Sequence, residues 1–281
     1  CGGPSSEHDI SLRSALNISK SLNKNKYDTK LVYINKEGCF SKPFNIIETK
    51  DEFDLVKDTN KNVAGSIAEF LQVLKDYSPE NTIIIPAIHG TYGEDGTIQG
   101  FLDCIRFPYI GNGLLSSALC MDKVTTNDIF EKNNLSQAKY LYTYKEGFDD
   151  EFMQRCIDEI DLPLIVKPSA NGSSVGVSKV ENKDELKEAM AEALKYDQKV
   201  LVEELIDGQE IEIAVIGQGN NLDASAPAAY ITNHKFLDYD AKYFDSKTIA
   251  QIPYEMEESY KNKAKEFAKD CYRAAGCEGF A

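Results

Sequence analysis

Residues 83–96 read IIIPAIHGTYGEDG, in which an apolar run starting at Ile83 leads into a polar loop from His89 to Gly96. Core residues followed at once by turn residues predict a buried strand that opens into an irregular loop at the end of a sheet. Loops at the ends of strands in α/β sheets carry substrates. A metal site is a poor interpretation, because one histidine and two acids in so short a loop lack the usual ligand pattern. A purely structural loop remains an alternative.

Strands and helices alternate on the N-terminal side of this stretch. Leu31–Ile34 is predicted to be a strand, and apolar residues at helical spacing predict helices over 12–22 and 67–74. Ser5 or Ser6 is the predicted N-cap of the first helix. This alternation is typical of a parallel, doubly wound sheet.

The second half of the chain has a different pattern. One helix is predicted from Ser116 to Phe130, and apolar strands are predicted at 164–166, 200–202 and 211–215. Asn182 and Glu185 form a capping-box pattern that opens another helix, and a last helix covers 260–271. Domain borders are expected near residues 115–122 and 205–210.

The bulk composition is that of an ordinary globular protein, with 42% hydrophobic and 27% charged residues among 281. A net charge of −15 disfavours nucleic acid as a partner, and no apolar run reaches the roughly 18 residues that a membrane span needs. An anionic ligand would therefore need a local basic pocket or a metal ion. Seven dispersed cysteines, without a C-x-x-C pair, predict small buried thiols in a reducing compartment.

The segment Gly172-Ser173-Ser174-Val175-Gly176 lies between two predicted strands. Backbone N–H groups of a glycine-rich loop can approach phosphate oxygens, and serine hydroxyls add further donors. The segment is neither a P-loop nor a dinucleotide fingerprint, and a plain hairpin turn explains it equally well. Lys167 favours the phosphate hypothesis, because a lysine at the end of a buried strand needs an anionic partner.

Other polar residues give weaker signals. Glu203, Glu204 and Glu210 could accept hydrogen bonds from an adenine amino group or ribose hydroxyls, but an acid-rich surface hairpin is the simpler explanation of these residues alone. Lys123 is uninformative by itself, since a lysine on a helix surface is usually solvated. The position of Glu7 in the first turn of a helix is explained by the helix dipole.

Taken in order, these segments resemble D-alanine–D-alanine ligases. Residues 2–11 read GGPSSEHDIS and resemble the family's G-G-x-S-x-E-x-x-x-S, and residues 89–100 match H-G-x-x-G-E-D-G-x-x-Q-G. Residues 166–176 match V-K-P…G-S-S-V-G. Asp122-Lys123, then Glu203, Gly208 and Glu210, and finally Tyr239 with Lys242-Tyr243 complete a resemblance over nearly the whole chain.

The resemblance implies an ATP-grasp enzyme of the α/β class. Its doubly wound N-terminal substrate-binding domain would cover residues 1–120, and an α+β ATP-grasp domain of two subdomains would cover 121–207 and 208–281. The implied reaction passes through an acylphosphate of the first D-alanine, for peptidoglycan precursor synthesis. ATP with Mg²⁺ or Mn²⁺, D-alanine as substrate, a homodimer and a cytoplasmic location are implied as well.

Residue roles follow from the matching motifs. Glu7 would orient the first D-alanine, His89 would lie near its carboxylate, and Lys242 would reach the transferred phosphoryl group. Ser173 and Tyr243 would form, with Glu7, a hydrogen-bonded set that holds the closing loop. The phosphate-binding residues would be Lys123, Lys167, Gly172, Ser173, Ser174, Val175 and Gly176. The adenine and ribose contacts would be Glu203, Glu204, Ile206 and Glu210.

Two departures from the family pattern shape the expectations. The family has a strand before Gly2, and it places the metal-binding Asp, Glu and Asn after the last helix, so these ligands would lie beyond Ala281. We therefore expect the intact protein to be an enzyme and these 281 residues alone not to ligate. A catalytically incomplete nucleotide-binding piece is the alternative. Lys242-Tyr243 argues against D-lactate as the second substrate, whereas D-serine stays open.

Overall fold

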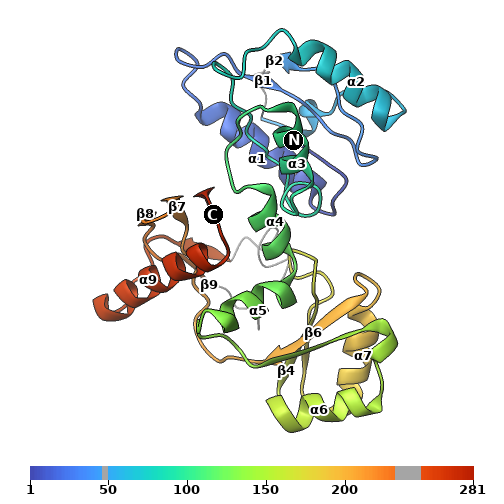
Figure 1. Ribbon diagram of the computed structural model, residues 1–281, viewed down its shortest axis with the longest axis vertical. Coiled ribbons are helices and arrows are strands. Elements are labelled where there is room, and N and C mark those ends of the chain that lie inside the picture. Colours follow the sequence, from blue (N-terminus) through green and yellow to red (C-terminus); the bar gives the residue numbers. More distant parts are fainter. Residues whose placement is uncertain (46–49, 232–247) are drawn as a thin grey trace. The chain divides into compact units, whose positions relative to one another are not determined.

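The computed structural model describes residues 1–45, 50–231 and 248–281. The chain forms two compact units, Cys1–Ala118 and Leu119–Ala281 (Figure 1). Within the described part of the chain, no helix has the length and apolar character needed to cross a bilayer. None of the seven cysteines, all of them described, is in a disulfide; Cys39 and Cys156 are buried, but Cys104 and Cys120 are exposed.

The first unit consists of short strands between helices. Its elements are α1 (His8–Ser21), β1 (Lys30–Leu31), β2 (Phe44–Asn45), the 3-10 helix η1 (Glu52–Leu55), α2 (Val63–Leu74) and α3 (Thr97–Ile105), and α4 (Leu114–Met121) begins in it. β1 and β2 pair antiparallel. Among the described residues of this unit, parallel pairing is limited to single bridges, Gly2 with Ile34 and Ile84 with Tyr109.

The two apolar strands predicted in this unit are therefore shorter than expected. Ile84 makes only two backbone hydrogen bonds across its bridge, one to Pro108 O and one from Ile110 N, both of 2.9 Å. Ile83 is 53% exposed, so it is not the core residue that the sequence predicted. The parallel direction of both bridges agrees with a doubly wound arrangement.

Helices cover both faces of these extended segments. Tyr33 and Ala87 pack in a cluster with the α1 residues Leu12, Ala15 and Leu16. Their neighbours Ile34 and Ile88 pack in a second cluster with residues of α2 and α3. Since consecutive side chains of an extended backbone point to opposite faces, α1 lies on one side and α2 and α3 lie on the other. This is the α/β layering expected for the N-terminal domain.

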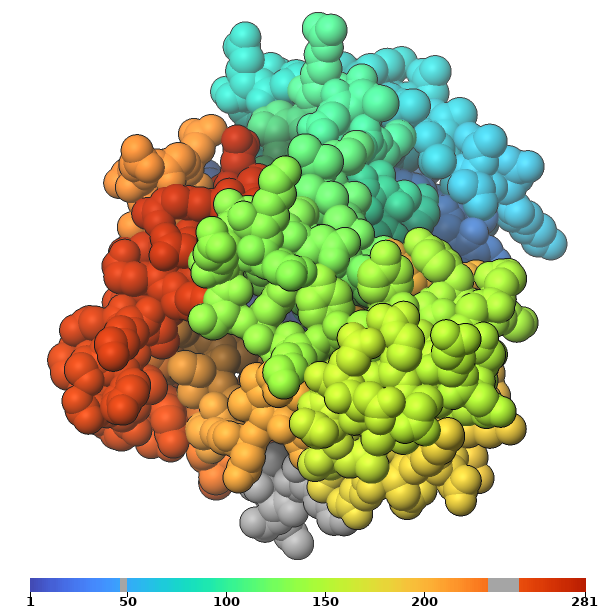
Figure 2. All heavy atoms as spheres, turned by 60° about the horizontal axis from the view of Figure 1, so that its bottom comes forward, coloured from blue at the N-terminus to red at the C-terminus, as the bar shows by residue number. Residues whose placement is uncertain are grey.

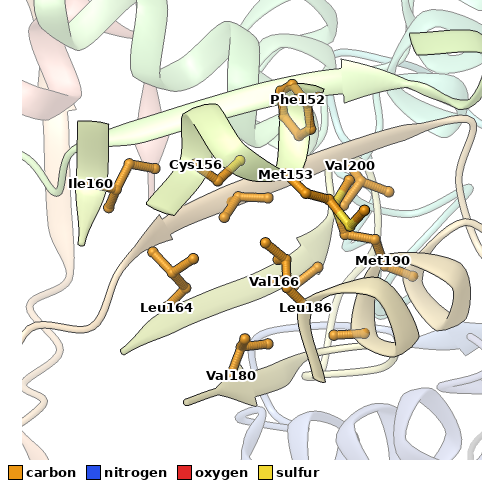
Figure 3. Packing of buried hydrophobic residues seen from close by; sticks show 13 residues of the cluster. Phe152, Met153, Cys156, Ile160, Leu164, Val166, Val180, Leu186, Met190 and Val200 are labelled. Atoms are coloured by element: carbon orange, nitrogen blue, oxygen red, sulfur yellow. The ribbon is translucent and has the colours of Figure 1, made fainter. Parts of the chain in front are cut away.

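The second unit contains a four-stranded antiparallel sheet of order β3-β6-β4-β5. The elements around it are α5 (Lys123–Lys132), β3 (Tyr140–Tyr144), η2 (Lys145–Gly147), α6 (Asp150–Ile160), β4 (Leu164–Pro168), β5 (Ser178–Val180), α7 (Lys183–Ala193) and β6 (Lys199–Glu204). α6 and α7 bury one face of the sheet, where Val166, Val180 and Val200 are 0% exposed (Figure 3). Each such side chain contributes about 1.5–3 kcal/mol by burial. The opposite face carries both polar and apolar side chains, among them Lys167, Glu203 and the fully buried Leu201.

One helix was predicted from Ser116 to Phe130, and this prediction is wrong. Asp122 has an extended backbone, and its carboxylate accepts the N–H of Thr125 at 3.0 Å, so it ends α4 and caps a new helix, α5. The capping box predicted at Asn182 is confirmed: Asn182 Oδ1 accepts the N–H of Glu185, and Glu185 Oε2 accepts the N–H of Glu181.

The remainder of the second unit forms smaller sheets. It comprises β7 (Val215–Gln218), β8 (Asn221–Ala224), β9 (Ala229–Ile231), β10 (Ile249–Gln251), α9 (Glu258–Ala274) and β11 (Gly279–Phe280), in sheets of order β11-β7-β8 and β10-β9. The strand predicted at 211–215 starts only at Val215. The predicted last helix is confirmed as α9; of its residues only Tyr272 is buried, and its atoms lie at the surface in Figure 2.

Candidate functional site

Glu7 lies at the N-terminus of α1 and is 5% exposed. The predicted cap at Ser5 or Ser6 is wrong, because α1 begins at His8 and no side chain caps it. Ser5 Oγ instead accepts the N–H of Glu7 at 3.2 Å and donates to His89 O at 2.7 Å. A Cβ atom on Gly90 would lie 2.6 Å from Glu7 Oε2. The first unit therefore brings Glu7 against the loop that starts at His89.

Three serine hydroxyls hold His89. Ser11 Oγ accepts its backbone N–H at 2.9 Å, Ser5 Oγ donates to its carbonyl, and Ser14 Oγ lies 2.7 Å from its Nε2. Glu94 Oε1 lies 3.4 Å from Nδ1 on the other side of the ring. A ring held from two sides keeps one orientation.

The acids of the same loop stabilise the loop itself. Glu94 Oε2 accepts the N–H of Gly90 at 3.0 Å, and Asp95 accepts the N–H groups of Tyr92 and Thr97 at 2.8 and 2.9 Å. A Cβ atom on Gly93 would lie 2.1 Å from the carbonyl oxygen of Ile88, so only glycine fits. Much of the H-G-x-x-G-E-D-G pattern therefore builds the loop, as the structural alternative proposed.

Lys167 and Glu203 form an ion pair in the second unit, with side chains 20% and 16% exposed. In the β4–β6 register Ile165 lies opposite Glu203 and Lys167 lies opposite Leu201. Lys167 and Glu203 are thus diagonal neighbours on one face of the sheet. The expected anionic partner of Lys167 is therefore a protein carboxylate, and Glu203 is not the solvated surface acid that its sequence context favoured.

Lys123 is the first residue of α5 and points to the start of the glycine-rich segment. Its ammonium donates to Asn171 O at 2.5 Å and lies 3.4 Å from Ser169 O. Burial lowers the pKa of Lys123, and the nearby charge of Lys167 lowers it further. The charges of Glu203, Asp197 and Asp122 act in the opposite direction and raise this pKa. The solvated-lysine interpretation is wrong for this residue, since its ammonium is largely buried and hydrogen-bonded to carbonyl oxygens.

The segment Gly172–Gly176 is a hairpin loop between β4 and β5, as the plain-turn interpretation predicted. Ser173 and Ser174 have φ angles of 50° and 58°, in the left-handed region. Consecutive non-glycine residues in this region cost about 1–3 kcal/mol each, a strain found at ligand-binding loops. The loop is therefore held in a conformation that its own residues disfavour.

The remaining predicted site residues are dispersed. Glu204 Oε1 accepts the N–H of Lys139 at 2.9 Å, beside the start of β3. Ile206 is 65% exposed, and Glu210 is exposed too. Lys242 and Tyr243 lie outside the described residues.

Residues 1–45, 50–231 and 248–281 contain no group of three His, Cys, Asp or Glu side chains placed to hold a metal ion. A cavity of about 840 Å³ lies along β3 and α6, lined by Tyr140, Tyr142 and Arg155 among others, and no predicted site residue lines it.

Sequence reasoning missed the residues around Lys123. Asp122, Ser169 and Lys199 are joined by hydrogen bonds and an ion pair beside it. The one available signal was an aspartate directly before the lysine, at a position where a helix could begin.

Comparisons with known proteins cover the whole chain. The family model described as D-ala D-ala ligase N-terminus matches residues 1–112, and the one described as D-ala D-ala ligase C-terminus matches 129–281. A D-alanine–D-alanine ligase of Finegoldia magna is 43% identical over 100% of this chain and 79% of its own length. One from Enterococcus hirae is 36% identical over 100% and 80%.

Solved structures give the same result. The D-alanine–D-alanine ligase from Coxiella burnetii superposes with a TM-score of 0.79 at 27% identity, over 100% of this chain and 77% of that one. The VanG D-Ala:D-Ser ligase from Enterococcus faecalis superposes with a TM-score of 0.77 at 27% identity, over 99% and 82%.

Proposed function

The chain belongs to the D-alanine–D-alanine ligase family, and we propose that it joins two D-alanine molecules to D-alanyl-D-alanine at the expense of ATP. It is an ATP-dependent ligase with an ATP-grasp fold. Within the structure, the observation that carries the proposal is the pair of cations, Lys123 and Lys167, beside the glycine-rich hairpin of the second unit.

ATP binding is assigned to the second unit. Lys123 and Lys167 bind phosphate oxygens, and the loop of Gly172, Ser173, Ser174, Val175 and Gly176 closes over them. What supports this is the placement of two largely buried lysines beside the loop in a chain of net charge −15, together with a loop whose left-handed backbone can turn N–H groups toward an anion. Glu203, Glu204, Ile206 and Glu210 hold the adenine and ribose.

D-Alanine binding is assigned to the first unit. The carboxylate of Glu7 pairs with the amino group of the first D-alanine, and His89 lies by its carboxylate. The burial of Glu7 beside Gly90 and the serine contacts of His89 support these roles, since both side chains are held in place before substrate arrives. The family motif assigns Lys242 to the transferred phosphoryl group and Tyr243 to the closing loop; both residues lie outside the described part of the chain.

The reaction has two displacement steps. A carboxylate oxygen of the first D-alanine attacks the γ-phosphorus, the bond from that phosphorus to the β–γ bridging oxygen breaks, and ADP leaves. The amino nitrogen of the second D-alanine then attacks the acyl carbon, loses a proton and displaces inorganic phosphate. The protein contributes position and charge neutralisation, which dominate phosphoryl transfer.

A divalent cation accompanies ATP in this family, and Mg²⁺ or Mn²⁺ is proposed here. It would neutralise charge on the phosphate oxygens. Because the described residues hold no group of metal ligands, no step is assigned to the metal.

The wider setting is also proposed. The enzyme acts as a homodimer in the cytoplasm, in peptidoglycan precursor synthesis. Its second unit comprises subdomains 121–207 and 208–281, consistent with separate sheets and separate apolar clusters on either side of residue 208.

The proposal is tested by ADP release with ATP and D-alanine, with products identified by mass spectrometry. ADP and D-alanyl-D-alanine should appear together, and neither should appear without D-alanine. D-Serine offered as acceptor together with D-alanine should give mostly the D-alanine dipeptide. Preferential formation of D-alanyl-D-serine, the product named for the VanG relative, would overturn the substrate assignment.

A further inference from the structure

The carboxylate of Asp122 has three partners. It accepts the N–H of Thr125 at 3.0 Å and the hydroxyl of Ser169 at 2.7 Å, and it forms an ion pair with Lys199. The first contact caps α5, whereas the other two reach Ser169, directly after β4, and Lys199 in β6, more than 40 residues away along the chain. An ordinary N-cap needs only the first of these contacts.

Ser169 is the centre of this cluster and is 0% exposed. Its carbonyl oxygen accepts the N–H of Lys123 at 3.0 Å, its own N–H donates to Lys199 O at 3.0 Å, and its hydroxyl donates to Asp122. Ser169 lies directly after β4, three residues before Gly172. The first turn of α5 is thus fastened to the root of the glycine-rich hairpin.

Of the two lysines in the cluster, Lys199 forms the ion pair with Asp122 and Lys123 does not. Burial alone would raise the pKa of Asp122, but the hydrogen bond from Lys199 and those from Thr125 and Ser169 hold it below its usual value. Burial would lower the pKa of Lys199, yet Asp122 raises it. Lys199 therefore satisfies Asp122, while the hydrogen bonds of the Lys123 ammonium go to neutral carbonyl oxygens. The charges of Glu203, Asp197 and Asp122 also act on Lys123, but its two hydrogen bonds to carbonyl oxygens leave a third N–H of the ammonium for a phosphate oxygen.

We propose that Asp122, Ser169 and Lys199 form a positioning set that fixes the Lys123 ammonium at the root of the glycine-rich hairpin, in place for a phosphate oxygen of ATP. The three residues act through Lys123 and not on the reacting atoms. The inference rests on the proposed phosphate contact of Lys123. This role goes beyond helix capping, since two of the three contacts of the Asp122 carboxylate are with residues outside α5.

The first test compares Asp122→Asn with Asp149→Asn in the enzyme. Asparagine caps a helix as well as aspartate does, so Asp122→Asn keeps the cap but loses the charge that holds Lys199. Asp149 is the matched control, because it caps α6 by accepting the N–H of Phe152 at 2.8 Å. Asp122→Asn should raise the KM for ATP on the order of tenfold and leave the KM for D-alanine unchanged. Asp149→Asn should change neither; equal effects of the two variants on the KM for ATP would overturn the proposal.

A double-mutant cycle tests the positioning role of Asp122 separately from the proposed phosphate contact of Lys123. Lys123→Ala alone should weaken ATP binding; if it does not, the phosphate contact of Lys123 is wrong. If it does, adding Asp122→Asn should cost little more, because the set acts only through Lys123. An equal loss of ATP affinity from Asp122→Asn with and without Lys123 would contradict positioning. Should Asp122→Asn fail to fold, Ser169→Ala replaces it in the same cycle, since that change removes one hydroxyl and no charge.

Discussion

The loop at His89–Gly96 and the hairpin loop at Gly172–Gly176 are both rich in glycine, but they are built differently. The first satisfies its own backbone with the carboxylates of Glu94 and Asp95. The second is strained at Ser173 and Ser174, and Asn171, the residue before it, accepts a hydrogen bond from the Lys123 ammonium. A highly specific motif can thus encode mainly loop architecture, whereas a weakly specific one stands beside the cations. The two loops should consequently fail in different ways when altered.

The largest effect is expected in the first loop, from Gly93→Ala. The added Cβ would lie 2.1 Å from Ile88 O, which is backbone and cannot give way. We expect a loss of roughly 3 kcal/mol or more in the free energy of unfolding, measured by urea denaturation. Gly113→Ala is the control, since nothing lies within 4 Å of its Cβ position. A change of equal size in both variants would refute this account of the loop.

In the second unit, Lys167→Met should damage catalysis more than stability. Removing a cation from the transferring phosphates should lower kcat/KM for ATP by about 10²–10³-fold. Lys179→Met, which breaks the more exposed pair with Glu181 on β5, should stay within about twofold. Steady-state kinetics of both variants check this prediction. Comparable losses of kcat/KM for ATP would contradict a specific role of Lys167 in binding the phosphates.

The pH dependence of ATP binding tests the role of Lys123, the second cation beside the hairpin loop. Burial, and then Lys167, lower the pKa of Lys123 below its ordinary value of 10.5. A lysine is charged below its pKa, so ATP affinity should hold at neutral pH and fall as pH rises through that lowered value. Lys123→Arg stays charged throughout and should flatten this alkaline limb in calorimetric titrations. An unchanged limb in the arginine variant would assign it to another group.

The smallest expected effect concerns strain in the hairpin. At Ser174, with φ of 58°, glycine costs less than alanine because it lacks a Cβ atom. Ser174→Gly should be more stable than Ser174→Ala by about 1 kcal/mol, measured by chemical denaturation. Alanine as stable as glycine would mean that the loop relaxes and stores no strain.

Short sequence patterns correctly predicted the elements whose hydrogen bonds join residues close in the sequence. The Asn182–Glu185 box and the helix over 260–271 were correct because their hydrogen bonds close within a few residues. The Ser5 cap failed because α1 begins only at His8, and the Ser5 hydroxyl donates to His89 O, 84 residues away. The break at Asp122 was missed because apolar spacing continues across it.

The candidate site was predicted in outline only. The need of Lys167 for an anion could be read from its place at a strand end, but the identity of Glu203 as partner depends on the β4–β6 register. The Asp122, Ser169 and Lys199 set joins three separate elements, so no spacing pattern reveals it. The resemblance supplied the role of each residue that local chemistry left open.

The most direct test of the division of labour between the two units is ATP binding by calorimetry in two variants. Lys167→Met should weaken ATP binding strongly, whereas His89→Gln should leave it unchanged and raise only the KM for D-alanine. Weakened ATP binding in His89→Gln together with unaltered binding in Lys167→Met would contradict the assignment of nucleotide to the second unit and of D-alanine to the first.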